Sequence, residues 1–181
     1  KKISKKLGNY VDVEQLLTIH GTDAIRLYIL QSGVSMAEPL AFKEDDIKII
    51  NKDLFQFKNC ADFLIEHLTN QKHHGVDFNI TAYINTNNIM DKWIIQHINT
   101  LNKKIIEFMD GYQITKATRL VIDMIEDITN WYVKFNRDRL KGKQGEREWI
   151  ISTSVLYHVI IKYCILIAPF APFFSQLIYN L

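Results

Sequence analysis

Apolar side chains recur along most of this chain at alternating steps of three and four residues, the spacing of one face of an α-helix. The pattern is clearest in two stretches, with apolar residues at positions 47, 50, 54, 57, 61, 64 and 68 and at positions 114, 117, 121, 124, 128, 131 and 135. Only 7 Gly and 3 Pro occur in 181 residues. This scarcity of turn residues favours long helices over a β fold.

Breaks in the pattern place the expected elements. Two short helices are expected in residues 13–30, separated at Gly21, with Thr22 or Asp23 capping the second helix. An irregular connector over 33–43 is followed by long helices at about 45–71, 88–111, 114–140 and 146–167, and by a fifth helix from Pro172. We therefore predict an all-α fold, an antiparallel helix bundle with a short N-terminal loop-helix appendage.

The helix expected at 146–167 belongs to an apolar run, Val155 to Phe174, that has the length of a membrane span. His158 and Lys162 interrupt this run, whereas a span of about 20 residues should be cleaner in its middle. We expect a buried bundle helix here and no contact with a membrane.

Charge is distributed unevenly although the net charge is only +2. Residues 1–6 and 134–147 together hold ten basic and two acidic side chains, a charge of +8, whereas the other 161 residues carry −6. A mildly acidic body with two basic regions is typical of a protein that touches a polyanion at defined places. Cations at a solvated helix end are the alternative explanation.

Cysteine and histidine give no sign of metal chemistry. Cys60 and Cys164 are too few and too far apart for a disulfide framework or a zinc site, which favours a reducing compartment. His73 and His74 have no third ligand at a useful spacing, so we expect no metal site.

The first residues, Lys2-Ile3-Ser4-Lys5-Lys6, resemble the lysine-methionine-serine-lysine-serine loop of class I aminoacyl-tRNA synthetases. The resemblance implies that Lys2, Ser4 and Lys5 are catalytic and stabilise the charge that develops when an amino acid attacks ATP. It also implies that Lys5, and then Lys2, binds ATP. Ile3 and Lys6 depart from the family pattern, so the role of its final serine is absent.

Three further motifs follow in the family's order. The segment 21–28 resembles a Gly-Ala-Asp-Ala-Leu-Arg element, 130–140 resembles the Asn-Trp-Tyr-Val-Arg segment of the anticodon-binding domain, and 168–173 resembles its Ala-Pro-aromatic-x-Pro-Phe turn. The resemblance implies that residues 1–43 end a catalytic domain and that 44–181 form an anticodon-binding bundle, truncated at its C-terminus. The family's nucleotide-binding and editing domains would lie upstream, so this chain alone should be inactive.

Residues 37–44, Ala-Glu-Pro-Leu-Ala-Phe-Lys-Glu, resemble the corresponding stretch of the eukaryotic-type isoleucine enzymes within this family. The implied activity is joining isoleucine to its tRNA in the cytoplasm with ATP and Mg²⁺, neither expected bound to this chain alone. The implied partners are an isoleucine tRNA and the upstream domains, with no DNA. A valine enzyme is the main alternative, followed by a free-standing tRNA-binding module and a protein-interaction scaffold.

The second basic region supplies the expected RNA contacts. Lysine and arginine bind phosphates, and unstacked bases prefer aromatic or guanidinium faces. The residues proposed to bind tRNA are Asn130, Trp131, Lys134, Arg137, Arg139 and Lys141. Trp131 also lies on the apolar stripe, which favours a place in the core, so Arg137 and Arg139 are the stronger candidates.

Overall fold

The computed structural model describes residues 12–181, and all regular secondary structure in this part of the chain is helical. The four rods of the bundle are α3 (Glu44–His73), α4 (Ile89–Asp110), the consecutive segments α5 (Ile114–Glu126), π-helical η4 (Asp127–Val133) and α6 (Lys134–Leu140), and α7 (Glu146–Ile167). The short elements are α1 (Val13–His20), α2 (Thr22–Gln31), η2 (Gly33–Met36), η3 (Ala82–Asn85) and α8 (Pro172–Tyr179). The prediction of an all-α fold is confirmed.

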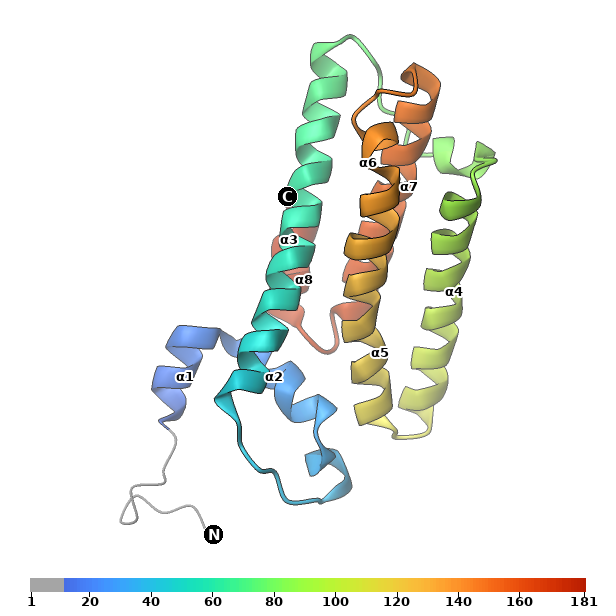
Figure 1. The fold of residues 1–181 in the computed structure, drawn as a ribbon. Coiled ribbons are helices and arrows are strands. Elements are labelled where there is room, and N and C mark those ends of the chain that lie inside the picture. Colours follow the sequence, from blue (N-terminus) through green and yellow to red (C-terminus); the bar gives the residue numbers. More distant parts are fainter. Residues whose placement is uncertain (1–11) are drawn as a thin grey trace.

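The long helices run side by side with alternating direction (Figure 1). The segments α5, η4 and α6 follow one another as one continuous rod between α4 and α3 (Figure 1). The helices α1 and α2 pack at one end of the bundle, where α2 touches α3, α5 and α8. The turn from α6 to α7 and the end of α3 lie at the opposite end (Figure 1).

The interior is built from the apolar stripes that the sequence shows. In α3 the stripe residues Ile47, Leu54 and Phe57 are buried, and the Phe57 ring lies 4.5 Å from that of Tyr163 in α7. The Tyr163 hydroxyl donates a hydrogen bond of 2.9 Å to the backbone carbonyl of Val121 in α5. Each such large side chain removed from water contributes about 1.5–3 kcal/mol, so tertiary packing holds the helices in place.

The helix α7 is long and apolar enough to cross a membrane by length and composition. In the structure, 61% of its most apolar stretch is buried, and it touches α3, α4, α6 and α8. A helix that is apolar almost all round is expected at the centre of a bundle. The arrangement matches the buried bundle helix predicted for this segment.

Candidate functional site

The helix from 114 to 140 changes its pitch where the family-like segment begins. From Ala117 to Ile128 the expected apolar stripe is buried. The π-helical segment η4 then inserts additional residues into the turn, and the buried face moves forward by one position. Tyr132 is fully buried in place of Trp131, and Asn136 is buried in place of Phe135. The expectation that Trp131 belongs to the core is therefore wrong.

The same shift exposes two aromatic rings. Trp131 and Phe135 are 50% and 64% exposed, and their ring centroids lie 5.8 Å apart. Their planes are tilted by 34°. Asn130 and Lys134, which alternate with them in sequence, are exposed as well. An apolar ring pair surrounded by polar groups is suited to stacking against a planar ligand.

Cations cover the neighbouring part of the helix surface. Lys134, Arg137 and Lys141 are exposed, and none of their side chains has a hydrogen-bond or ion-pair partner within residues 12–181. The remaining pair on this surface is Lys143 with Asp138, whose atoms Nζ and Oδ1 lie 2.8 Å apart. A bond from Lys143 and its charge lower the pKa of Asp138, which stays ionised. The surface keeps an excess of positive charge beside the aromatic pair.

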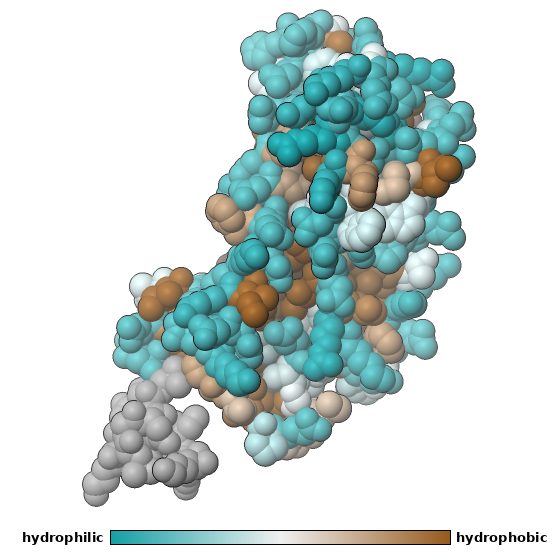
Figure 2. Space-filling view, in the orientation of Figure 1, coloured by the Kyte–Doolittle hydropathy of each residue, from teal (hydrophilic) through white to brown (hydrophobic). Residues whose placement is uncertain are grey.

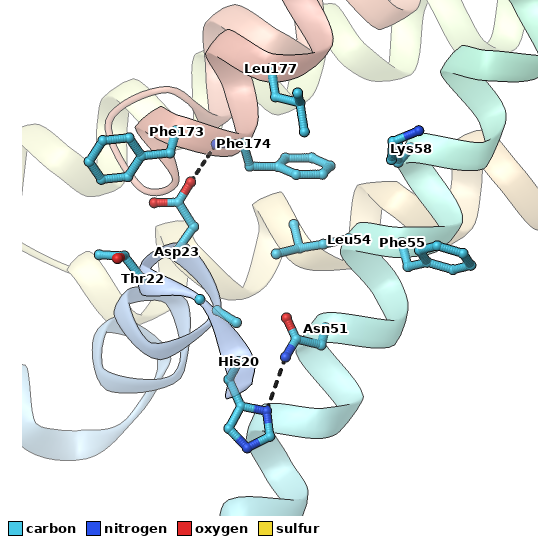
Figure 3. A pocket seen from close by; sticks show the side chains of 12 residues that line it. His20, Thr22, Asp23, Asn51, Leu54, Phe55, Lys58, Phe173, Phe174 and Leu177 are labelled. Carbon is cyan, nitrogen blue, oxygen red and sulfur yellow. Dashed lines mark hydrogen bonds between the residues drawn. The ribbon is translucent and has the colours of Figure 1, made fainter. Parts of the chain in front are cut away.

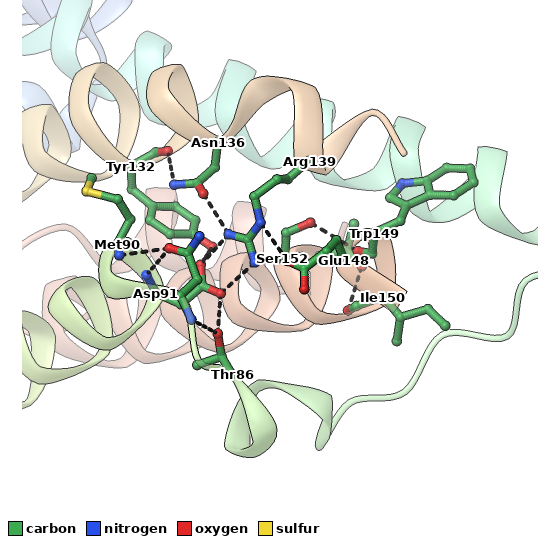
Figure 4. Close-up of polar contacts among 12 residues, drawn as sticks. Thr86, Met90, Asp91, Tyr132, Asn136, Arg139, Glu148, Trp149, Ile150 and Ser152 are labelled. Atoms are coloured by element: carbon green, nitrogen blue, oxygen red, sulfur yellow. Dashed lines mark hydrogen bonds and ion pairs between the residues drawn. The ribbon is translucent and has the colours of Figure 1, made fainter. Parts of the chain in front are cut away.

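Arg139 has a different role from the cations around it, and the expectation that it contacts RNA is corrected by the structure (Figure 4). Its side chain is buried and donates two hydrogen bonds of 2.9 Å to the Asp91 carboxylate in α4. It also donates to Asn136 at 2.7 Å and to Glu148 at 3.0 Å. With its donors satisfied inside the bundle, Arg139 is not available to a polyanion.

Asp91 is the centre of this buried network. It also accepts hydrogen bonds from the hydroxyls of Tyr132, at 2.8 Å, and Thr86, at 2.6 Å. Burial would lower the pKa of Arg139, but its bonds to Asp91 and Glu148 raise the pKa above its usual value. Burial and the neighbouring Asp91 charge raise the pKa of Tyr132, which therefore stays a neutral donor. The network fixes α6 and η4 against α4, and with them the exposed rings.

The other end of the bundle joins two of the family-like motifs. In α2, Asp23 accepts a hydrogen bond of 2.5 Å from the backbone N–H of Phe174 in the first turn of α8 (Figure 3). Arg26 donates to the backbone carbonyls of Pro169 and Phe170, both at 3.2 Å. Asp23 thus caps α8 rather than α2, contrary to the expectation from local sequence. An open cleft of about 390 Å³ lies beside this contact. Side chains of α2, α3 and α8 line it, among them Asp23, Leu54 and Phe174 (Figure 3).

The candidate ATP residues Lys2, Ser4 and Lys5 lie outside the described residues. Within residues 12–181, no group of three or more His, Cys, Asp or Glu side chains is arranged to hold a metal ion. Within the described residues, the candidate site is the aromatic and basic surface on η4 and α6.

Comparison with known families agrees with this geometry. Residues 91–181 match the model described as the anticodon-binding domain of tRNA ligase. Residues 1–41 match the model described as tRNA synthetases class I (I, L, M and V). The chain therefore belongs to the class I aminoacyl-tRNA synthetases and contains their anticodon-binding domain. Enzymes of this family use ATP, and an anticodon-binding domain implies binding of tRNA.

Among the members of the family, the chain is similar to isoleucine–tRNA ligases. It is 37% identical to the cytoplasmic isoleucine–tRNA ligase of Arabidopsis thaliana and 35% identical to that of Saccharomyces cerevisiae, in each case over 99% of this chain. The chain spans 16% and 17% of the length of these two proteins.

A solved structure shares the fold. The crystal structure of a ternary complex of Agrobacterium radiobacter K84 LeuRS, tRNA and LeuAMS superposes with a TM-score of 0.59 at 16% sequence identity. The match covers 99% of this chain and 20% of that one. The likeness shows that a class I synthetase has this arrangement of helices.

The sequence pattern missed several residues that shape the site. Asp91 carries no local signal, because its partners Tyr132 and Arg139 lie 41 and 48 residues away. The spacing of Phe135 predicts a core position, but its side chain is exposed. The sequence holds one signal of the buried polar network. Asn136 and Arg139 are three residues apart and therefore share one face of the helix, and a purely apolar stripe would not contain such residues.

Proposed function

We propose that this chain is the anticodon-recognition part of a cytoplasmic isoleucine–tRNA ligase. The full-length enzyme would activate isoleucine with ATP and transfer it to its tRNA. The observation that carries the proposal is the similarity, over 98–99% of this chain, to isoleucine–tRNA ligases from organisms as distant as Arabidopsis thaliana and Caenorhabditis elegans. The similar isoleucine–tRNA ligases of Arabidopsis thaliana, Saccharomyces cerevisiae and Caenorhabditis elegans are named cytoplasmic, which supports the same compartment here.

The surface on η4 and α6 supports binding of unpaired RNA. An anticodon loop presents unstacked bases beside a strand of phosphates. Trp131 and Phe135 offer rings on which a base can stack, a contact worth about 1–3 kcal/mol per base. Lys134, Arg137 and Lys141 offer the charges that bind phosphates. Asn130 is exposed beside Trp131 and can donate or accept a hydrogen bond at a base edge.

The N-terminal loop belongs to the catalytic half of the proposal. We assign Lys2, Ser4 and Lys5 to the ATP phosphates in the full-length enzyme, because they match the family's signature loop. Ammonium groups placed there would stabilise the negative charge that builds up as pyrophosphate leaves. Magnesium in the full enzyme would share this charge. The proposed division into a catalytic tail over 1–43 and an anticodon-binding bundle over 44–181 follows the same resemblance.

A binding titration tests the recognition half. The chain is titrated against an isoleucine tRNA transcript, the same transcript with a swapped anticodon, and a valine tRNA transcript, each at two salt concentrations. Salt-dependent binding that weakens on the swap is expected. Binding that ignores the swap would make the chain a general RNA-backbone binder, and preference for the valine transcript would overturn the isoleucine assignment. Absence of binding at low salt contradicts the proposed surface.

A further inference from the structure

The C-terminal end of α3 carries basic side chains that the family-like motifs do not include. Lys72, His73 and His74 follow one another in its last turn and at its cap, and all three are exposed. The side chains of Lys72 and His73 have no hydrogen-bond or ion-pair partner within residues 12–181. Figure 2 shows hydrophilic side chains gathered over this end of the bundle.

Packing joins this end of α3 to the turn between α6 and α7. The His74 ring lies edge-on to Trp149 in α7, with centroids 5.8 Å apart. Gly142 also lies against Trp149, so closely that a Cβ atom there would be only 2.8 Å from the indole ring. Gly142 also has a φ of +75°, so glycine is needed there for two reasons. One indole thus holds both elements at the same end of the bundle.

The pKa of His67, in the same helix α3, responds to cations at the end of α6. Its side chain is buried, and its Nε2 atom has no partner. Burial lowers the pKa of His67 most, Glu66 opposes the shift, and the charges of Lys141 and Arg137 lower it further. The end of α3 and the turn that follows α6 lie at the same end of the bundle (Figure 1), which agrees with the charges of Lys141 and Arg137 acting on a residue of α3.

We propose that Lys72 and His73 form a second contact site for the sugar-phosphate backbone of RNA, continuing the surface of Arg137 and Lys141 onto α3. The inference rests on the proposed function, since it assumes that a base reaches the rings of η4 and α6. The exposed rings favour a nucleic acid over other polyanions, because an acidic peptide or a membrane surface has no base to stack on them. The RNA strand that supplies the base would pass over α3 with its phosphates.

The local acids leave this surface net positive. Asp138 is paired with Lys143, and Glu66 and Asp77 are the exposed carboxylates nearest in sequence to the end of α3. Cations at a helix C-terminus also offset the partial negative charge of the last carbonyl groups. That stabilising role and RNA binding make different predictions, because only RNA binding changes the salt dependence of affinity.

The test compares two double variants of the chain. Lys72→Gln/His73→Gln removes the proposed contact. The control, Lys103→Gln/Lys104→Gln, removes two exposed lysines in the C-terminal part of α4. Affinity for the isoleucine tRNA transcript is measured from low to physiological salt. We expect the first variant to bind several-fold more weakly at low salt, with a log–log salt slope less steep by about 0.7 for the lost charge of Lys72. The control pair should keep the slope of the unaltered chain.

A slope and affinity unchanged in Lys72→Gln/His73→Gln would overturn the inference, while anticodon-dependent binding by the unaltered chain would leave the proposed function standing. If the unaltered chain binds no RNA, both fail together. A cleavage experiment gives an independent readout. Cys60 and Cys164 are buried, so His73→Cys creates a single exposed thiol for an iron chelate. Radical cleavage confined to one stretch of the tRNA backbone is expected, and cleavage no stronger than from Lys103→Cys contradicts the contact.

Discussion

Arg139 and Asp91 form a two-pronged ion pair inside the bundle, in which Nη1 and Nη2 each donate a hydrogen bond of 2.9 Å to one carboxylate oxygen. The pair connects α6 to the first turn of α4, across 48 residues of chain. It divides the basic run into two kinds of residue. Arg137 is exposed and available to a ligand, whereas Arg139, two positions later, is part of the core.

The division predicts opposite phenotypes for two similar substitutions. Arg139→Gln leaves a buried carboxylate without its charge partner and should destabilise the fold by about 3–5 kcal/mol. Arg137→Gln changes an exposed side chain and should alter stability by no more than about 0.5 kcal/mol. Urea unfolding followed by circular dichroism measures both.

RNA titration then separates the two arginines. Arg137→Gln should make the salt slope of tRNA affinity less steep by the amount that one phosphate contact contributes, while the fold is retained.

An Asp91→Asn/Arg139→Gln double variant should recover part of the stability lost in Arg139→Gln, because both charges are removed. Equal stability of Arg137→Gln and Arg139→Gln would refute the structural role of Arg139.

The exposed rings should contribute to binding and little to folding. Trp131→Ala and Phe135→Ala are each expected to weaken tRNA affinity by about 1–3 kcal/mol if a base stacks on the ring. Both side chains are at least half exposed, so unfolding midpoints should change little. Trp131→Phe should restore most of the affinity, since it keeps an aromatic face.

A matched control for these variants lies on α3. Phe55 is 62% exposed, close to Phe135 in accessibility, and it lines the cleft at the other end of the bundle. Phe55→Ala should leave tRNA affinity unchanged. If Trp131→Ala and Phe55→Ala have the same affinity for the anticodon-bearing transcript, the ring pair has no part in recognition.

The sequence predicted most helices because each apolar stripe is a local signal. In α3 the apolar positions from Ile47 to Leu64 recur at regular spacing, and the neighbouring helices bury all of them. The shift in η4 follows from contacts that are distant in sequence. Tyr132 is drawn inward by its hydrogen bond to Asp91, and the arginine beyond it is drawn to the same carboxylate. Periodicity alone assigns Trp131 to the core because it contains no information about α4.

Capping residues show the same limit. Asp23 stands at the start of α2, where a carboxylate commonly accepts bonds from its own helix. In the fold its acceptor is used by Phe174, 151 residues later, because the turn before α8 supplies only Ala171 at the cap position. The prediction that Thr22 or Asp23 caps α2 is therefore wrong, because the partner of Asp23 lies 151 residues away in the chain.

Asp23 predicts a stability change that depends on pH. Burial raises the pKa of Asp23, although the Phe174 N–H and the charge of Arg26 oppose the shift. At pH 7 the folded state bears the cost of a buried carboxylate, and this cost is relieved as pH falls through the folded pKa toward the unfolded value of about 3.9. Asp23→Asn should therefore be more stable than the unaltered chain at pH 7, with the difference shrinking at lower pH in urea unfolding.

Asp23→Ala separates the cap from the charge. Alanine offers no acceptor to the Phe174 N–H, so the variant should lose about 0.5–2 kcal/mol relative to Asp23→Asn. The two variants share the absence of a carboxylate, and their difference should be independent of pH. A gap between them that grows or vanishes with pH would contradict the assignment of the cap.

His67 predicts the opposite pH dependence in α3. Burial holds the pKa of His67 below its ordinary value of about 6.5, so the unfolded chain takes up a proton at a higher pH than the folded chain does. Its stabilising contribution is present above about pH 6.5 and is lost as pH falls through the folded pKa. His67→Leu removes an unpartnered buried nitrogen and should flatten the decline in urea midpoint between pH 7.5 and 5. His73→Leu, an exposed position in the same helix, is the control; an equal effect of both substitutions would refute the role of burial.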